Sequence, residues 1–259
     1  MNQAKEKQKY NVPALENAFS ILRLLSRNRF KESTITEISN ALNLNPATCY
    51  RLLRVMEEMA VVRYMEDKKR YTLGPYLVVL GERAKEHLDY LLIIQPYLER
   101  LAKDTQMTAI LVNKINDRKL AIVSKAEASD FGVTVSVGRH FSISDGSFGL
   151  CLLAYLDKEK RKDILHAGTG LKTYTETEIE AMEKELDTLK KRGYHITYGE
   201  YVKGLCGIAA PLLTHGDKVE MSIELIGFTS RHDKADLEGK GLLIKEAAME
   251  ISRKLKGDE

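Results

Sequence analysis

Cysteine is scarce in this sequence of 259 residues, and the three cysteines, Cys49, Cys151 and Cys206, lie far apart in apolar contexts. An odd number of widely separated cysteines argues against a disulfide framework. Neither they nor the six scattered histidines have the spacing of zinc ligands. We therefore expect no metal ion, no cofactor and a location in the reducing cytoplasm.

Long apolar runs are also absent. No run reaches the roughly 18 residues that a membrane-spanning helix requires, so we expect no membrane partner. The first ten residues, MNQAKEKQKY, are polar and charged, which predicts a disordered tail over residues 1–11 and no signal peptide. There is no internal repeat, and Gly199, Gly204 and Gly207 lack the strand–turn–helix context of a phosphate-binding loop.

The net charge is only +3, but it is unevenly distributed. Residues 1–75 hold 13 Lys and Arg against 8 Asp and Glu, whereas the other residues hold 27 against 29. A basic N-terminal part on a slightly acidic body is typical of a DNA-binding domain joined to a domain that does not bind DNA, although chance alone also produces a difference of this size. The length agrees with two domains.

Residues 34–60, TITEISNALNLNPATCYRLLRVMEEMA, predict a helix-turn-helix. Thr34 and Glu37 form a capping box, which satisfies free N–H groups at a helix start, and apolar residues then recur at helical spacing. After a short turn, Asn45 suits an N-cap and Pro46 suits the first position of a second helix that runs to about residue 60. A helix over residues 13–27 completes a three-helix core.

The second helix of this motif has two faces. An apolar stripe, which includes Leu53, should pack inward. The opposite side carries a small residue, an aromatic hydroxyl and two guanidinium groups, which suit base edges and phosphates in a DNA major groove: Ala47, Tyr50, Arg51 and Arg54. The alternative is an ordinary amphipathic helix with a solvated basic face.

A charged hairpin follows this helix. Two short strands, at residues 62–64 and 71–73, flank a turn that contains Lys68, Lys69 and Arg70. A hairpin at this place is a wing, and its cations would reach the phosphate backbone or the minor groove. Taken alone, a charged hairpin tip is usually only solvated, so its position after the helix-turn-helix carries the prediction.

The rest of the chain predicts a helical linker and an α+β domain. Helices are expected over 76–87 and 90–103, with a kink or break near residue 95 caused by Pro96. Their apolar residues exceed one core stripe, which favours a dimer contact. Further strands are expected at 108–115, 119–125, 132–137, 194–198, 207–213 and 219–226, and further helices at 147–156, 158–166, 176–192 and 237–255. This pattern favours an antiparallel sheet with helices packed on it.

With these elements in place, the chain resembles the IclR family of bacterial transcription regulators over nearly its whole length. The resemblance depends on the winged helix-turn-helix and on five segments in order: 71–74 (YTLG), 147–154 (SFGLCLLA), 192–194 (RGY), 204–211 (GLCGIAAP) and 221–227 (MSIELIG). It implies a winged helix-turn-helix domain over 12–74, a helical linker over 75–104 and a GAF-like effector-binding domain over 105–259.

The resemblance also implies function. Family members are commonly repressors, and sometimes activators, that bind near-palindromic double-stranded DNA operators as dimers or dimers of dimers. Their usual effectors are small organic acids or aromatics. Many members begin the recognition helix with a Lys-Ser-Thr-like sequence, whereas this chain has Pro46, Ala47 and Thr48. Thr48 keeps a hydroxyl for DNA, but the operator cannot be transferred from a relative.

The family's effector pocket corresponds here to Ser147, Phe148, Thr197, Gly207, Glu224 and Ile226. In the last strand, Ser222, Glu224 and Ile226 should face the pocket, while Val219, Met221, Ile223 and Leu225 face away. The helix start at Ser147 and Phe148 suits an anion. A carboxylate at residue 224 repels one, so a ligand with a hydroxyl or amine group is expected. Alternatively, Glu224 faces solvent or pairs with a Lys or Arg.

Two rival interpretations remain. A hydrolase-like enzyme or other small-molecule-binding protein without DNA binding would use Ser147 or Cys206 as a nucleophile. A nucleophile needs a base within hydrogen-bond reach, and no histidine is near either residue in sequence. A protein-interaction module without DNA binding would have no use for Arg51, Arg54 and the basic wing. Both rivals are therefore disfavoured, and we expect no enzyme.

Overall fold

The computed structural model describes residues 12–86, 88–128, 132–168 and 174–257. The chain divides into two compact units, Met1–Leu88 and Asp89–Glu259, and each has a buried core of its own. The expected tail over residues 1–11 lies outside the described residues. Every helix in the described part of the chain is too short or too polar to cross a membrane.

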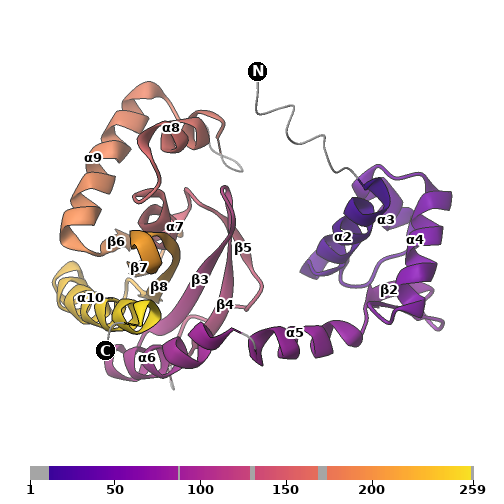
Figure 1. Cartoon of the computed structure of the whole chain (residues 1–259), viewed down its shortest axis with the longest axis horizontal. Coiled ribbons are helices and arrows are strands. Elements are labelled where there is room, and N and C mark those ends of the chain that lie inside the picture. The colour runs from indigo at the N-terminus through magenta and orange to yellow at the C-terminus, as the bar shows by residue number, and fades with distance from the viewer. Residues whose placement is uncertain (1–11, 87, 129–131, 169–173, 258–259) are drawn as a thin grey trace. The chain divides into compact units, whose positions relative to one another are not determined.

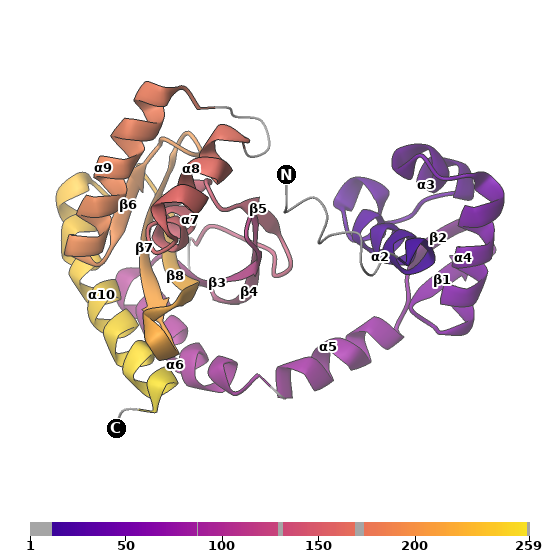
Figure 2. The same cartoon turned by 45° about the horizontal axis from the view of Figure 1, so that its top comes forward.

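The first unit is a winged helix-turn-helix followed by one more helix (Figure 2). Its elements are α2 (Pro13–Leu25), the short helix η1 (Asn28–Phe30), α3 (Ile35–Leu42), α4 (Pro46–Glu58), β1 (Val62–Met65), β2 (Arg70–Leu73) and α5 (Tyr76–Glu86). The two strands form an antiparallel hairpin. One face of each of the three helices buries apolar side chains, among them Ile21, Ile38 and Leu53.

The turn between α3 and α4 follows from local side-chain chemistry. The Glu37 N–H donates to the Thr34 hydroxyl (3.2 Å), and the Thr34 N–H donates to the Glu37 carboxylate (2.7 Å). Asn43 adopts the left-handed conformation (φ 52°) that ends α3. The Asn45 side chain accepts from the Ala47 N–H (2.9 Å), and Pro46 opens α4. The predicted capping box and N-cap are thus confirmed.

Replacing Thr34 by alanine should lower the free energy of unfolding of the first unit by about 1 kcal/mol, because the Glu37 N–H loses its acceptor. A domain of this size loses roughly 4–8 °C in melting temperature per kcal/mol. Thr36→Ala, an exposed substitution in the same helix, keeps both cap bonds and should not lower the melting temperature. Equal losses in the two variants, measured by calorimetry, would show that the cap contributes nothing.

The second unit is built on one six-stranded sheet with the strand order β5-β4-β3-β8-β7-β6. All neighbouring strands are antiparallel. The strands are β3 (Thr108–Asn116), β4 (Lys119–Ala126), β5 (His140–Ser142), β6 (His195–Tyr198), β7 (Leu205–Leu213) and β8 (Val219–Phe228). The predicted α+β class with an antiparallel sheet is confirmed.

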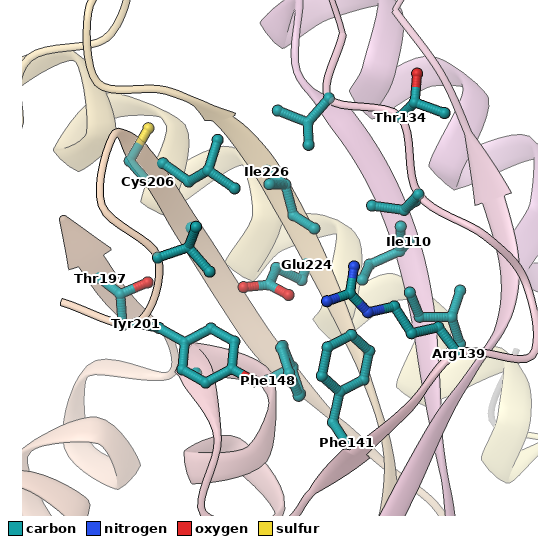
Figure 3. Close-up of a pocket in the computed structure, with 17 residues that line it drawn as sticks. Ile110, Thr134, Arg139, Phe141, Phe148, Thr197, Tyr201, Cys206, Glu224 and Ile226 are labelled. Atoms are coloured by element: carbon teal, nitrogen blue, oxygen red, sulfur yellow. The ribbon is translucent and has the colours of Figure 1, made fainter. Parts of the chain in front are cut away.

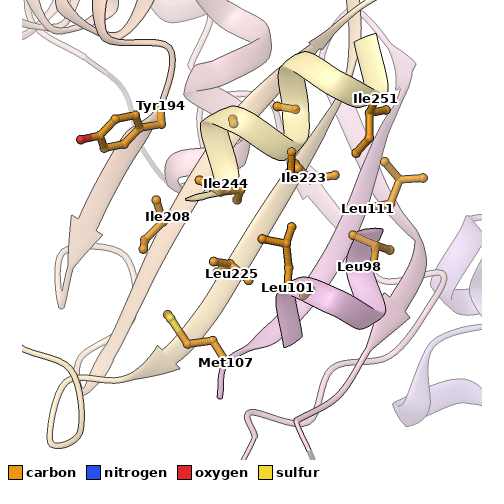
Figure 4. Packing of buried hydrophobic residues seen from close by; sticks show 14 of the residues in the cluster. Leu98, Leu101, Met107, Leu111, Tyr194, Ile208, Ile223, Leu225, Ile244 and Ile251 are labelled. Atoms are coloured by element: carbon orange, nitrogen blue, oxygen red, sulfur yellow. The ribbon is translucent and has the colours of Figure 1, made fainter. Parts of the chain in front are cut away.

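Helices pack on both faces of this sheet (Figure 1). One face is covered by α6 (Asp89–Thr105) and α10 (Lys234–Lys256), and the other by α7 (Gly146–Leu153), α8 (Lys158–His166) and α9 (Glu176–Arg192). β8 lies in the middle and separates the two layers. Ile223 and Leu225 pack under α6 and α10 (Figure 4), whereas the alternate residues, Ser222 and Glu224, face α7.

Three expectations about this unit are wrong, each for a physical reason. α6 continues through Pro96, so the expected alternative of a break near residue 95 is wrong. Burial of Ile94, Leu98 and Leu101 at about 1.5–3 kcal/mol each exceeds the cost of about 3 kcal/mol for an interior proline. Residues 132–137 form no strand, and the edge strand is β5 instead. Val219 packs in the α7 layer, because a register shift next to Leu213 reverses the alternation there.

Candidate functional site

The recognition helix α4 presents its predicted DNA-facing side chains to solvent. Ala47, Tyr50, Arg51 and Arg54 are exposed, whereas Cys49, Leu53 and Met56 are buried in the core of the first unit; Thr48 is half-buried. Arg54 pairs with Glu57 at 3.0 Å, but both side chains reach solvent. An exposed pair of this kind is worth less than about 1 kcal/mol, so it leaves the guanidinium free to move to a phosphate.

Two of the wing's basic side chains form ion pairs within the first unit, which the sequence did not reveal. Lys68 pairs with Glu32 at 3.1 Å, and Arg70 pairs with the capping residue Glu37 at 2.9 Å. Arg70 also donates to the main-chain carbonyl of Glu32 (2.9 Å), which ties β2 to the segment before α3. The hydrogen bonds from Thr34 and the nearby Arg70 charge lower the pKa of Glu37. Lys69 is exposed, with no ion pair to another described residue.

The second unit contains a cavity of about 100 Å³ between β8, β7, α7 and the segment that leads into β5 (Figure 3). This is close to the roughly 150 Å³ of cavities that hold one benzene ring. Most of its surface is apolar or aromatic, and the polar side chains are few. The lining residues are Ile110, Ile122, Val133, Thr134, Val135, Arg139, Phe141, Gly146, Phe148, Thr197, Tyr201, Val202, Leu205, Cys206, Gly207, Glu224 and Ile226.

The structure brings the six residues expected in the pocket together, with one difference. Phe148, Thr197, Gly207, Glu224 and Ile226 line the cavity, whereas Ser147 is fully buried behind Glu224 and donates a hydrogen bond to its carboxyl group. Gly207 is required for this arrangement. A Cβ at this position would lie 2.5 Å from a Glu224 oxygen and 3.0 Å from both the Ser147 and the Thr197 hydroxyls.

Glu224 neither faces solvent nor pairs with a basic side chain in the described part of the chain, so both alternatives for it are wrong. It is 4% exposed, and its second oxygen, Oε2, is buried without a hydrogen-bond partner. Burial raises its pKa to about 8, although the hydrogen bond from Ser147 opposes the shift. The group is therefore a neutral carboxylic acid at pH 7, and the repulsion that we expected against a bound anion does not apply.

Three polar residues of the cavity, Thr134, Arg139 and Tyr201, escaped sequence analysis. Arg139 lies outside regular structure, and its guanidinium stacks over the ring of Phe141 at 5.1 Å. Tyr201 lies between β6 and β7; burial and the neighbouring Asp145 carboxylate raise its pKa to about 12. The alternation of apolar and polar residues over 132–137 suggested a strand. It instead reflects the cavity, which Val133 and Val135 line.

Among the described residues, neither candidate nucleophile, Ser147 or Cys206, has an activating partner. Burial raises the pKa of both the Cys151 and the Cys206 thiols, which disfavours the reactive thiolate. The Ser147 hydroxyl donates to a carboxyl group that is itself neutral near pH 7, so that group is no general base. No cluster of metal ligands occurs within the described ranges.

A winged helix-turn-helix and a cavity-bearing α+β unit in one chain define a DNA-binding transcriptional regulator with an effector-binding domain. The chain belongs to the IclR family. The IclR helix-turn-helix domain matches residues 14–65, and the bacterial transcriptional regulator IclR C-terminal domain matches residues 83–253. The family resemblance is thus confirmed, and the protein is a regulator, not an enzyme.

Known proteins match this chain over nearly its whole length. An IclR transcriptional regulator from Alicyclobacillus acidocaldarius is 35% identical, with a TM-score of 0.85 over 94% of this chain and 98% of that one. The transcriptional regulator KdgR of Escherichia coli K12 is 26% identical over 96% of this chain and 95% of its own. An IclR homologue from Microbacterium hydrocarbonoxydans, solved in complex with 4-hydroxybenzoate, has a TM-score of 0.78 at 21% identity and covers 93% and 98%.

Proposed function

We propose that this regulator is a cytoplasmic repressor whose binding to a near-palindromic operator is controlled by a small organic metabolite in the Glu224 cavity. The observation that supports the proposal is the cavity itself, which is enclosed by α7 and by the central strands in a chain that also exposes a recognition helix. A fold relative that binds 4-hydroxybenzoate makes a small metabolite the natural occupant.

For DNA contact we propose Ala47, Thr48, Tyr50, Arg51 and Arg54 at the major groove, with Lys68, Lys69 and Arg70 at the phosphates. Lys69 is the strongest of the wing candidates, because it forms no ion pair with an acid in the described part of the chain. Arg70 is the weakest, because contact with DNA would break three hydrogen bonds, one to the Glu32 carbonyl and two to the Glu37 carboxylate.

We propose that the protein acts as a homodimer or a dimer of dimers, which would present two winged helix-turn-helix domains, the two heads, to a two-fold operator. The support is the apolar surface of α5, where Val78 is 66% exposed and Val79 and Leu80 are also exposed. An apolar cluster of this kind on a helix favours a second protein surface over water. In the regulatory mechanism that we propose, the ligand changes the placement of the two heads.

Replacing Val78 and Leu80 by glutamate should convert the oligomer into monomers and weaken operator binding at least tenfold, because one head then binds one half-site without its partner. Sedimentation velocity at micromolar concentration measures the first effect, and a gel-shift titration the second. Lys85→Glu on the same helix adds a negative charge outside the apolar surface and should leave both unchanged. Wild-type protein that sediments as a monomer would contradict the dimer.

The regulatory function is tested with full-length protein and with duplex DNA that the wild type enriches from a random-sequence library. Small metabolites are screened for compounds that raise the melting temperature, and those that bind are added to the protein–DNA complex. We expect a binding metabolite to release the DNA. A protein that binds metabolites but enriches no duplex would instead favour the small-molecule-binding alternative.

A further inference from the structure

The polar end of the cavity is built around one unsatisfied atom. Glu224 Oε1 accepts the hydrogen bond from Ser147, while Oε2 has none, although both lie in a fully buried carboxyl group. A buried polar atom without a partner is costly, and native proteins rarely keep one unless a ligand or water completes it. Because Glu224 lines the cavity, a ligand in the cavity can supply the missing partner.

The groups that face Glu224 favour its protonated form. Ile110 of β3 and Ala209 of β7 are its strand neighbours and are apolar. Ser147 and Cys151 face it from α7, and burial keeps the Cys151 thiol protonated by raising its pKa well above the usual value. Tyr201, whose pKa is raised to about 12, stays protonated too. Oε1 is occupied by the Ser147 donor, so the proton of the neutral acid sits on Oε2.

A fixed positive charge lines the same cavity. Figure 3 shows the Arg139 guanidinium pointing toward the Glu224 carboxyl group. No ion pair joins the two among the described residues, and Glu224 is protected from ionisation by burial rather than paired with the cation. Between these two donors the walls are apolar and aromatic, with Phe141 and Phe148 in edge-to-face contact at 4.9 Å.

We propose that Glu224 is a hydrogen-bond donor to the effector: its protonated Oε2 donates a hydrogen bond to a ligand oxygen, while Arg139 binds the ligand's carboxylate. The inference rests on the proposed effector function of this cavity. An ionised Glu224 would favour a ligand with an amine group. With a neutral Glu224, the cavity instead accepts small carboxylates and rejects amines. This donor role also makes ligand affinity depend on pH, because a deprotonated Glu224 would repel the anion.

The first experiment needs no ligand. Infrared spectra of full-length wild type and of Glu224→Gln are compared at pH 6.5 and pH 9.5. At pH 6.5 the wild type should show the carbonyl band of a protonated carboxylic acid that the variant lacks, and at pH 9.5 the band should vanish. Absence of the band at pH 6.5 would overturn the proposal, and the wild type's own pH difference decides the matter even where the variant does not fold.

The second experiment uses matched probes. Benzoate and 2-oxopentanoate are each compared with the amide and the amine of the same skeleton, by calorimetric titration of the full chain at pH 6.5 and 9. At least one carboxylate should bind the wild type, and its affinity should fall about tenfold at pH 9, one unit above the pKa of Glu224. Binding of the amines instead, or of neither carboxylate, would overturn the proposal.

Variants separate the two donors. Glu224→Gln places an amide donor where the acid proton was, so carboxylate affinity should stay within about threefold at pH 6.5 and lose its dependence on pH. Arg139→Gln should weaken binding at least tenfold at both pH values, because a charge-assisted hydrogen bond is lost. Arg118→Gln, an exposed arginine outside the cavity, is the matched control. A loss of binding in Glu224→Gln that equals the loss in Arg139→Gln would contradict the donor role of Glu224, because the glutamine amide still offers a donor.

These measurements concern binding alone, so they stay separate from the regulatory function. A carboxylate that binds with the expected dependence on pH but leaves the protein–DNA complex intact would support the role of Glu224 and contradict control of the operator. Release of DNA by an amine would support control and contradict the role of Glu224.

Discussion

Replacing Arg51 and Arg54 together by alanine is expected to weaken operator binding by about 100-fold. Each arginine that contacts a base edge or phosphate contributes roughly 1–3 kcal/mol, and every 1.4 kcal/mol is tenfold in affinity. Both side chains are exposed on α4, and neither fills the core, so folding is spared. Gel-shift titration against duplex DNA enriched by the wild type measures the loss, and the dependence of affinity on salt should become shallower.

The control removes two positive charges elsewhere. Arg118 is exposed in the turn between β3 and β4 of the second unit, and Lys119 is exposed at the first position of β4. Their double alanine variant should bind the same duplex with unchanged affinity. Melting temperatures of both variants should match the wild type within the range of ordinary surface substitutions. Equal loss of affinity in the two double variants would mean that total charge, rather than the α4 surface, attracts the DNA.

Glu224→Gln should stabilise the effector-binding unit at alkaline pH by roughly 5 kcal/mol. The pKa of Glu224 is about 8 in the folded protein and about 4.5 when exposed. A raised folded-state pKa gives stability that is complete below pH 4.5 and is lost progressively up to pH 8, at about 1.4 kcal/mol per unit. Glutamine is neutral throughout, so the variant avoids this loss. Its melting temperature at pH 8.5 should exceed that of the wild type by roughly 10 °C.

The sign of the effect is checked at acid pH. Below pH 4.5 both side chains are neutral in the folded and the unfolded chain, so the two melting temperatures should converge. Glu220→Gln, an exposed position on the same strand, should show no comparable dependence on pH. A variant that is less stable than the wild type at pH 8.5 would show that Glu224 is ionised in the fold and held by a partner.

Local chemistry explains why much of the fold was predictable. Thr34 with Glu37 forms the expected capping box, Thr175 with Glu178 forms a second one, and Gly193 closes α9 in the left-handed conformation. Such signals depend on residues within one helical turn of each other, so they can be recognised in a single sequence. Alternation in β8 likewise predicted which side chains lie on the same face as Glu224.

What escaped prediction depends on distant parts of the chain. The charge state of Glu224 follows from burial by β3, β7 and α7, which no neighbouring residue reveals. Arg139 belongs to an irregular segment that reaches the cavity only because β5 pairs with β4. The paired state of Lys68 and Arg70 also needed the fold, since their acidic partners lie more than thirty residues away.

The central position of β8 has a mechanical consequence. Glu224 and Leu225 are joined by one stiff peptide group, yet the first lines the cavity and the second packs under α6 and α10. α6 begins at Asp89, the residue at which the second unit begins. A displacement of this strand by a ligand would therefore reach the layer of α6 and α10 through the Leu225 side chain, across the thickness of one backbone.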